Sequence, residues 1–264
     1  MNLQRFIDAK QEELRALRQH MPPPLPLRRP DFRAALLAPP PAGEPLRVIA
    51  EYKRRSPSLG LINESLGAQE VAAQYAAGGA SCMSVLTEER FFGGQVGDLI
   101  AAAPAGLPLL RKDFIFDELQ VRATWATPAA ALLLIVALTP DVARLRGLRE
   151  LAEEQGLHAV VEIFTERELE LARESGARIV QVNARNLETL RTDRRAGLQL
   201  AAQRLPGECW IAASAMQTRS HLDEAAAAGY NAALVGTALM QGDSPLRNLR
   251  RLLHPESGCA TIPS

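Results

Sequence analysis

The stretch VIAEYKRRSPSLG, residues 48–60, joins the end of an apolar run to a cluster of charged and hydroxyl residues. Glu51 and Lys53 stand two positions apart, so on a β-strand their side chains point the same way. Ser56 follows in the next loop. An edge strand with a surface ion pair would give the same pattern. The functional interpretation is favoured because similar strand ends recur along the chain.

Apolar, strand-like runs recur eight times, and helix-like segments separate them. The predicted strands are 48–52, 82–86, 108–111, 131–136, 159–163, 179–182, 210–212 and 232–235. The predicted helices are 68–77, 95–103, 117–127, 140–155, 166–175, 196–204, 219–228 and 245–253. Eight strand–helix alternations predict an α/β fold, a parallel (β/α)8 TIM barrel. An open doubly wound sheet is the alternative, but no Gly-x-Gly-x-x-Gly turn follows the first strand.

The chain before residue 46 has a different pattern. Residues 1–20 carry apolar side chains at helical spacing, which predicts one amphipathic helix that packs on the core. A second short helix is expected at 31–37, and proline-rich connectors occupy 21–26 and 39–45.

Composition excludes several classes of partner. The chain has 30 basic and 30 acidic residues, which leaves no electrostatic footprint for nucleic acid or an anionic membrane. No apolar run approaches the roughly 20 residues that cross a bilayer. Cys82, Cys209 and Cys259 form no metal-like spacing and no even disulfide set, which predicts reduced thiols in a cytoplasm. The four histidines are scattered, so no metal is expected.

Lysine is rare in this chain. Of the 30 basic residues only three are lysine, namely Lys10, Lys53 and Lys112. Arginine stays protonated, whereas lysine gives up a proton when its surroundings lower its pKa. Lys53 and Lys112 both follow strand-like runs, which suggests that they were kept for chemistry.

Polar side chains gather where the predicted strands end. In a (β/α)8 barrel the carboxyl ends of the strands meet at one rim, where the active site lies. The loops after the last two strands often hold a phosphate there. The residues at these strand ends are Glu51, Lys53, Lys112, Glu162, Asn183, Arg185, Ser214, Gly236 and Thr237. As a set they predict a catalytic pocket, although each alone fits a structural ion pair or an ordinary turn.

Seven motifs together resemble those of the indole-3-glycerol phosphate synthase family, over nearly the whole chain to about residue 253. They are IAEYKRRSPS at 49–58, SVLTEERFFGG at 84–94, PLLRKDF at 108–114, LLLIVALT at 132–139, VVEI at 160–163, VNARNLETL at 182–190 and ALVGTALM at 233–240. The resemblance implies a helical extension over the barrel mouth (1–45), a barrel (46–254) and a tail (255–264), in a single domain overall.

The resemblance also implies a reaction and its residues. The expected substrate is a phosphorylated small molecule, a carboxyphenylamino-deoxyribulose phosphate, which closes to indole glycerol phosphate with loss of carbon dioxide and water. By similarity Lys112 is the acid, Glu162 the base and Lys53 the carboxylate ligand and second acid. Glu51 holds the lysines, and Asn183 orients Glu162 or substrate hydroxyls. The remaining implied contacts are Phe92, Phe114, Leu133 and Leu187 for the ring, Ser56, Ser214, Ala215, Gly236 and Thr237 for the phosphate, and Arg185 and Leu234. No cofactor is implied, and a monomer or weak homodimer is expected.

One segment departs from the family pattern. The seventh strand usually ends in Ser-Glu-Ser-Gly or Ala-Glu-Ser-Gly, and residues 212–215 here read Ala-Ala-Ser-Ala. The missing carboxylate at Ala213 would lower the pKa of the lysines, and a Cβ at Ala215 would crowd a phosphate unless its φ is negative. Three hypotheses follow. The chain is a working synthase, an impaired or repurposed paralogue that only binds a ligand or partner, or another phosphate-binding barrel enzyme such as a sugar-phosphate isomerase.

Overall fold

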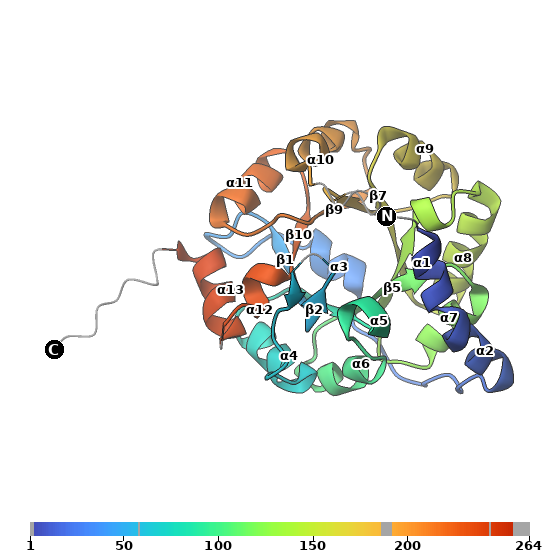
Figure 1. Cartoon of the computed structure of the whole chain (residues 1–264). Helices are drawn as coiled ribbons and strands as arrows, with labels where there is room; N and C mark the ends of the chain where they lie inside the picture. The colour runs from blue at the N-terminus through green and yellow to red at the C-terminus, as the bar shows by residue number, and fades with distance from the viewer. Residues whose placement is uncertain (1–2, 58, 186–191, 243, 256–264) are drawn as a thin grey trace.

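The computed structural model describes residues 3–57, 59–185, 192–242 and 244–255. Eight parallel strands close into one barrel in the order β1-β10-β9-β8-β7-β6-β5-β4, and β4 pairs with β1 (Figure 1). The strands are β1 (Arg47–Tyr52), β4 (Cys82–Leu86), β5 (Leu109–Ile115), β6 (Ala131–Ile135), β7 (His158–Ile163), β8 (Ile179–Asn183), β9 (Cys209–Ala213) and β10 (Ala232–Val235). The predicted (β/α)8 barrel is confirmed, and the open sheet is wrong.

A ring of helices covers the outside of the barrel (Figure 1). All eight predicted helices are present, with ends that differ by a few residues. They are α4 (Ala68–Ala77), α6 (Gly97–Ala102), α7 (Glu118–Trp125), α8 (Val142–Glu154), α9 (Glu166–Glu174), α10 (Arg194–Leu200), α11 (Arg219–Ala227) and α13 (Pro245–Leu253). One apolar cluster fills the space between helices and strands, and a second lies inside the barrel. The two faces of each strand are therefore buried against different layers.

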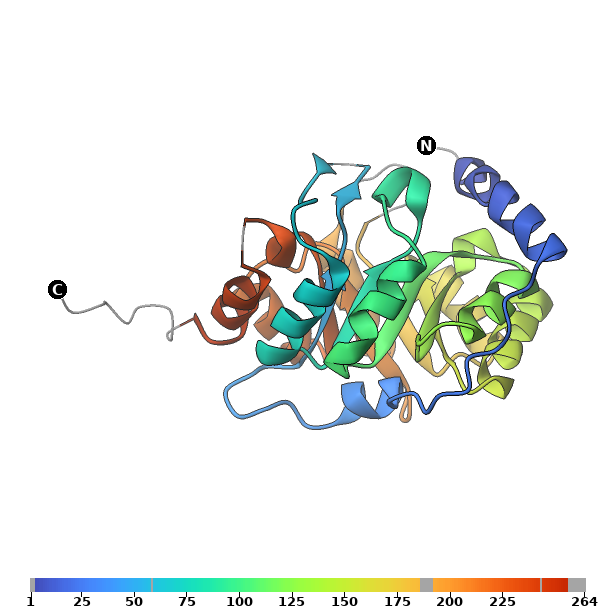
Figure 2. The ribbon, with the colours of Figure 1, turned by 90° about the horizontal axis from the view of Figure 1, so that it is seen from below.

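Several elements escaped the sequence pattern because two to four residues are too few to show an apolar periodicity. They are the hairpin β2 (Arg55–Ser56) and β3 (Gly60–Leu61), helices α5 (Glu89–Phe92) and α12 (Thr237–Met240), and the 3-10 turns η1 (Ala103–Ala105) and η2 (Val136–Leu138). A third 3-10 turn, η3 (Ala201–Gln203), continues α10 within the helix predicted at 196–204. Glu88 caps the N-terminus of α5, because its carboxylate accepts hydrogen bonds from three backbone N–H groups of the first turn. The hairpin, α5 and α12 all lie beside the barrel mouth (Figure 2).

The predicted helix at 1–20 is two helices, α1 (Gln4–Ala9) and α2 (Gln11–Gln19), which meet at Lys10. Phe6 of α1 joins the cluster inside the barrel, and α2, which carries the buried Leu14, packs on α7. Helix α3 (Phe32–Leu37) lies at the opposite end of the molecule from the mouth (Figure 2), where Phe32 and Leu36 join the cluster inside the barrel. Of the N-terminal segment, α1 is thus the part that reaches the mouth.

Strand β5 is longer than its apolar run predicts, because it continues through three charged residues. Leu110, Lys112 and Phe114 point into the barrel, whereas Arg111 and Asp113 point outward. The outward pair forms a buried ion cluster with Lys10 and Glu13, which we call the clamp. Its distances are 2.6 Å for Lys10–Asp113 and Lys10–Glu13, 2.8 Å for Arg111–Glu13 and 3.0 Å for Arg111–Asp113. The clamp attaches the N-terminal helices to the strand that carries Lys112.

Two further observations concern the environment of the chain. Within the described ranges, no helix is both long and apolar enough to cross a membrane. Cys82 and Cys209 are free, buried thiols, and burial raises the pKa of Cys209 to about 12. Both therefore stay protonated and unreactive at neutral pH. Cys259 lies outside the described residues.

Candidate active site

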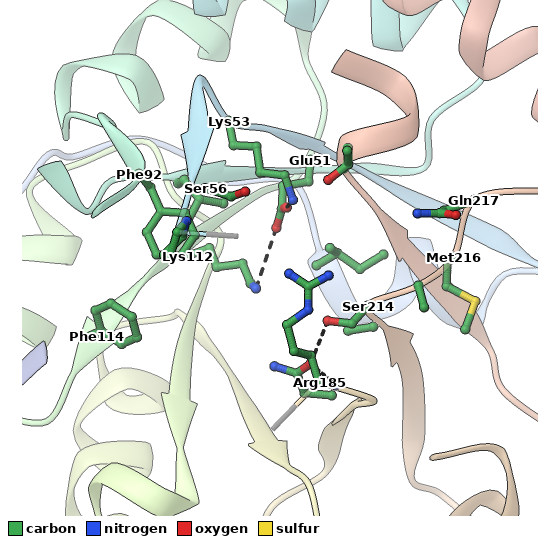
Figure 3. A pocket seen from close by; sticks show the side chains of 18 of the residues that line it. Glu51, Lys53, Ser56, Phe92, Lys112, Phe114, Arg185, Ser214, Met216 and Gln217 are labelled. Atoms are coloured by element: carbon green, nitrogen blue, oxygen red, sulfur yellow. Dashed lines mark hydrogen bonds and ion pairs between the residues drawn. The ribbon is translucent and has the colours of Figure 1, made fainter. Parts of the chain in front are cut away.

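A pocket opens at the carboxyl ends of the strands, and we call it the mouth pocket (Figure 3). Figure 3 shows Phe92 and Phe114 on one side, Ser214 and Met216 on the other, and the charged side chains between them. The predicted site residues that line it are Glu51, Lys53, Ser56, Phe92, Lys112, Phe114, Asn183, Arg185, Ser214, Ala215, Leu234, Gly236 and Thr237. Residues from six of the eight strands or their following loops thus meet in one place.

Glu51 bridges the two lysines of the pocket. Lys53 Nζ lies 2.7 Å from Glu51 Oε1, and Lys112 Nζ lies 3.6 Å from Glu51 Oε2. Burial alone would raise the pKa of Glu51, but the two ammonium groups hold it below its usual value. Burial would likewise lower the pKa of Lys112, yet Glu51 and Glu162 raise it above its usual value, even with no carboxylate at Ala213. Lys112 therefore carries a proton at neutral pH, as a general acid must.

Gly236 lets the end of β10 approach this charge cluster closely. A Cβ at this position would lie 2.4 Å from Glu51 Oε1 and 2.8 Å from Lys53 Nζ, so any larger residue would displace both groups. Gly236 also precedes α12, which begins at Thr237. The ammonium group of Lys53 therefore lies beside the loop that is predicted to bind the phosphate.

Glu162 lies next to the mouth pocket but does not line it. Its carboxylate faces a second cavity, the side chamber, which shares Asn183 and Arg185 with the mouth pocket. Asn183 Nδ2 donates to Glu162 Oε1 at 3.0 Å, and Gln181 Nε2 donates to Glu162 Oε2. Asn183 Oδ1 in turn accepts from Ser214 Oγ at 2.6 Å. The carboxylate is thus oriented through both oxygens by neutral amides.

The loop after β9 has an unusual backbone. Ser214 and Ala215 have φ values of 68° and 57°, and they are the only non-glycine residues of the described chain with positive φ. The left-handed region costs an alanine roughly 1–2 kcal/mol relative to its right-handed form. The negative φ that would suit an alanine at position 215 is not observed. The loop therefore keeps a glycine-type conformation although it contains no glycine.

Aromatic rings form the wall opposite this loop. Phe114 stacks on Phe6 of α1, with ring centroids 4.0 Å apart, and Phe92 lies 6.3 Å from Phe114. Leu133 belongs to the apolar cluster inside the barrel and does not line either cavity. Leu187 lies outside the described residues. The wall is thus built by two predicted rings and by Phe6, which the sequence did not single out.

Sequence reasoning missed six pocket residues and one supporting residue. The pocket residues are Arg5, Phe6, Pro57, Leu86, Met216 and Gln217, and the supporting residue is Gln181. A signal for Gln181 existed, because a glutamine in an otherwise apolar strand must find a buried partner. Arg5 and Phe6 gave no such signal, since only the docked position of α1 brings them to the pocket. Among the described residues, no group of three or more His, Cys, Asp or Glu could hold a metal ion.

Comparisons with known proteins show which family the chain resembles. A profile of the family described as "Indole-3-glycerol phosphate synthase" matches residues 3–252. The indole-3-glycerol phosphate synthase of Micrococcus luteus is 40% identical over 262 residues, covering 94% of this chain and 95% of that one. The protein of the same name from Arthrobacter sp. is 45% identical over 201 residues, covering 76% and 74%.

Solved structures extend the likeness of the fold. The 3-hexulose-6-phosphate synthase from Salmonella typhimurium gives a TM-score of 0.61 at 14% identity, covering 79% of this chain and 97% of that one. The thiamine phosphate pyrophosphorylase from Pyrococcus furiosus gives 0.58 at 14% identity, covering 79% and 94%. At this identity the likeness shows the barrel fold alone.

Proposed function

The chain belongs to the indole-3-glycerol phosphate synthase family, and from this premise we propose that the mouth pocket and side chamber together form its active site. The enzyme is a carboxy-lyase of tryptophan biosynthesis. It closes 1-(2-carboxyphenylamino)-1-deoxyribulose 5-phosphate to indole glycerol phosphate, releasing carbon dioxide and water. The chemistry needs a cationic acid, a base, an apolar wall for the ring and a site for the phosphate.

The charge of the mouth pocket is the observation that carries the proposed site. Among the described residues that line it, the cations Arg5, Lys53, Lys112 and Arg185 outnumber the one carboxylate, which belongs to Glu51. The substrate carries one carboxylate and a phosphate of nearly two charges, about −3 in total. A pocket with this surplus attracts and binds such an anion.

The shape of the pocket supports one orientation of the substrate. Phe92 and Phe114 lie across the pocket from Ser214 (Figure 3). In the proposed pose the aromatic ring lies against these two phenylalanines, and the phosphate lies on the loops of Ser214 and Gly236. Ser56 adds a hydroxyl from the loop after β1. The ribulose carbons then span the gap in which Lys112 stands, so the carbonyl group faces an ammonium donor.

Ring closure uses Lys112 as the acid. The ring carbon that bears the carboxylate attacks the carbonyl carbon, and Lys112 gives its proton to the carbonyl oxygen as the new carbon–carbon bond forms. The bond to the carboxylate then breaks, carbon dioxide leaves, and the electron pair returns to the ring. Glu51 keeps Lys112 charged and placed for this step.

Dehydration needs a base and a second acid. Glu162 takes the proton that leaves the substrate, and Lys53 protonates the departing hydroxyl, so that water is released. Asn183 and Gln181 hold the two oxygens of Glu162. The base is therefore ready without moving its carboxylate, which lowers the cost of reorganisation. No step in this scheme requires a cofactor.

The remaining parts of the proposal concern the whole molecule. We place the enzyme in the cytoplasm, as a monomer or weak homodimer, with the barrel at 46–254, the helical extension at 1–45 and the tail at 255–264. The free thiols of Cys82 and Cys209 suit a reducing compartment.

A turnover assay on the purified protein tests the proposal. The anilino-ribulose phosphate is added, indole fluorescence is followed, and released carbon dioxide is measured in parallel. We expect both products in a one-to-one ratio. Binding of the substrate without fluorescence or carbon dioxide would support a ligand-binding barrel and contradict the proposed chemistry.

A further inference from the structure

Arg5 reaches the mouth pocket from outside the barrel. It is the second residue of α1, and it lines the pocket beside Phe6. Its guanidinium carbon lies 4.3 Å from the centroid of the Phe6 ring and 5.0 Å from that of Phe91. Two aromatic faces therefore hold this cation in place, which fixes its position without neutralising its charge.

The charge of Arg5 has no anionic partner among the described residues. Its Nε and Nη2 atoms are buried and make no hydrogen bond there. The two pocket lysines, by contrast, both lie within 3.6 Å of Glu51. Burial lowers the pKa of Arg5, but a guanidinium stays protonated at neutral pH. A partly desolvated cation without an anionic partner is costly, and an arriving anion would recover part of that cost.

The position of Arg5 selects which anion this is. Phe6 stacks on Phe114, so Arg5 stands at the aromatic end of the pocket. Lys53, the residue that the family resemblance pairs with the carboxylate, lies instead beside Gly236 at the phosphate end. A substrate with its ring on Phe114 therefore presents the ring carboxylate, rather than the phosphate, to Arg5.

We propose that Arg5 is a substrate-binding residue that pairs with the ring carboxylate, so that α1 is a specificity element of the enzyme. The inference rests on the proposed function. Arginine suits this task because its two parallel N–H groups match a carboxylate. The carboxylate is lost during the reaction, so this ion pair stabilises the bound substrate more than the later transition states. Arg5 should therefore affect KM and specificity more than kcat.

Two unreactive analogues of the substrate separate the carboxylate from the rest of the molecule. In both, the ketone is reduced to an alcohol; one is the 2-carboxyphenylamino ribitol phosphate and the other the phenylamino ribitol phosphate without the carboxylate. Calorimetry measures their Kd for the wild type, Arg5→Gln and Arg5→Lys. The matched control is Arg90→Gln, because Arg90 also lies over the Phe91 ring, at 5.7 Å, but does not line the pocket.

We expect Arg5→Gln to weaken the carboxylated analogue about tenfold and the other analogue less than about twofold. Arg5→Lys should recover part of the loss, and Arg90→Gln should change neither Kd. Equal weakening of both analogues in Arg5→Gln would overturn the inference, since Arg5 would then only dock α1. No weakening of either would overturn it too. A wild type that binds neither analogue would overturn the proposed function itself, and the inference with it.

Discussion

Strand β5 serves two charged clusters, one on each face. Arg111 and Asp113 point outward into the clamp, and Lys112 between them points into the mouth pocket. The clamp has two cations and two carboxylates, with every cation within 3.0 Å of both partners. The described residues of the mouth pocket include four cations and one carboxylate, and its Lys112 is 3.6 Å from that carboxylate. Adjacent residues of one strand thus belong to a balanced cluster and an unbalanced one.

The difference separates a structural use of charge from a functional one. Buried charges are tolerated when each has a partner, as in the clamp. In the clamp, burial would raise the pKa of Asp113, but Lys10 and Arg111 lower it to about 2. An excess of partly buried cations, by contrast, destabilises the free protein, and binding of an anionic ligand offsets that cost. From this difference in charge balance we infer that the clamp holds the fold together and that the mouth pocket binds the anionic substrate.

One substitution in each cluster tests whether the clamp serves stability and the mouth pocket serves catalysis. We predict that Lys112→Met lowers kcat by about 10³-fold, because it removes the general acid. Binding of a reduced substrate analogue should persist, and the free energy of unfolding should change by less than about 1 kcal/mol because an unbalanced cation is lost. Steady-state kinetics and calorimetry measure the two effects. Unchanged turnover in this variant would refute the assigned role.

The reverse outcome is expected for Lys10→Met in the clamp. Removing one partner leaves Asp113 and Glu13 with only Arg111, and breaking a buried ion cluster in this way costs about 3 kcal/mol of unfolding free energy. At 25 °C and saturating substrate, kcat should change less than about threefold. Urea unfolding and kinetics check the pair of values. A variant with wild-type stability would show that the clamp does not hold the N-terminal helices.

The clamp also predicts a dependence of stability on pH. The pKa of Asp113 is about 2 in the folded state and near its ordinary 3.8 when unfolded, so its contribution is complete above about pH 4. It is lost as the pH falls through 2, and it amounts to about 2 kcal/mol. Urea unfolding between pH 5 and pH 2 measures the loss. The loss should be smaller in Lys10→Met; an identical slope in both proteins would exclude Asp113 as its source.

The same contrast explains what sequence reasoning could achieve. The barrel was predictable because eight apolar runs alternate with amphipathic helices, and apolar periodicity reports burial directly. The predicted strand at 108–111 stopped early because Lys112 and Asp113 were assigned to the loop at the barrel rim, whereas Arg111 and Asp113 are buried in the strand against Lys10 and Glu13. The single helix predicted at 1–20 also missed its break at Lys10. Contacts between residues about 100 positions apart leave no local pattern.

The sequence predicted most residues of the site, but not which of the two cavities each residue lines. Strand ends identified Lys53, Lys112 and Asn183, and the structure places all three in the mouth pocket. Glu162 lines the side chamber instead, where hydrogen bonds from Asn183 and Gln181 orient its carboxylate. The pattern of strand ends says which residues meet at the rim, but side-chain packing decides which cavity each one enters.

Glu162 differs from the carboxylates of both clusters, because neutral amides rather than cations hold it in place. We predict that Gln181→Met, which keeps the volume but removes the donor, lowers kcat about tenfold and leaves KM within about twofold. Gln181 lines neither cavity, so substrate affinity should not change. Gln120→Met is the matched control, since Gln120 is equally buried but donates to Phe114 O on the outer face. It should lower stability with kcat preserved. Equal kcat losses in both variants would indicate general loosening instead of positioning.

The smallest expected effect concerns the backbone of the phosphate loop. At φ 57°, Ala215→Gly should raise the free energy of unfolding by about 1 kcal/mol, because glycine adopts this region freely. The same change at Ala73, an exposed position of α4, should lower it by about 0.5–1 kcal/mol. Chemical denaturation compares the two signs.

Combined with Ala213→Glu, which adds a second carboxylate beside the lysines, Ala215→Gly should also raise turnover. Ala215→Gly could stabilise the protein while the double variant turns over no faster than the wild type. In that case the strained backbone affects only stability, and the pocket does not need a second carboxylate beside its lysines.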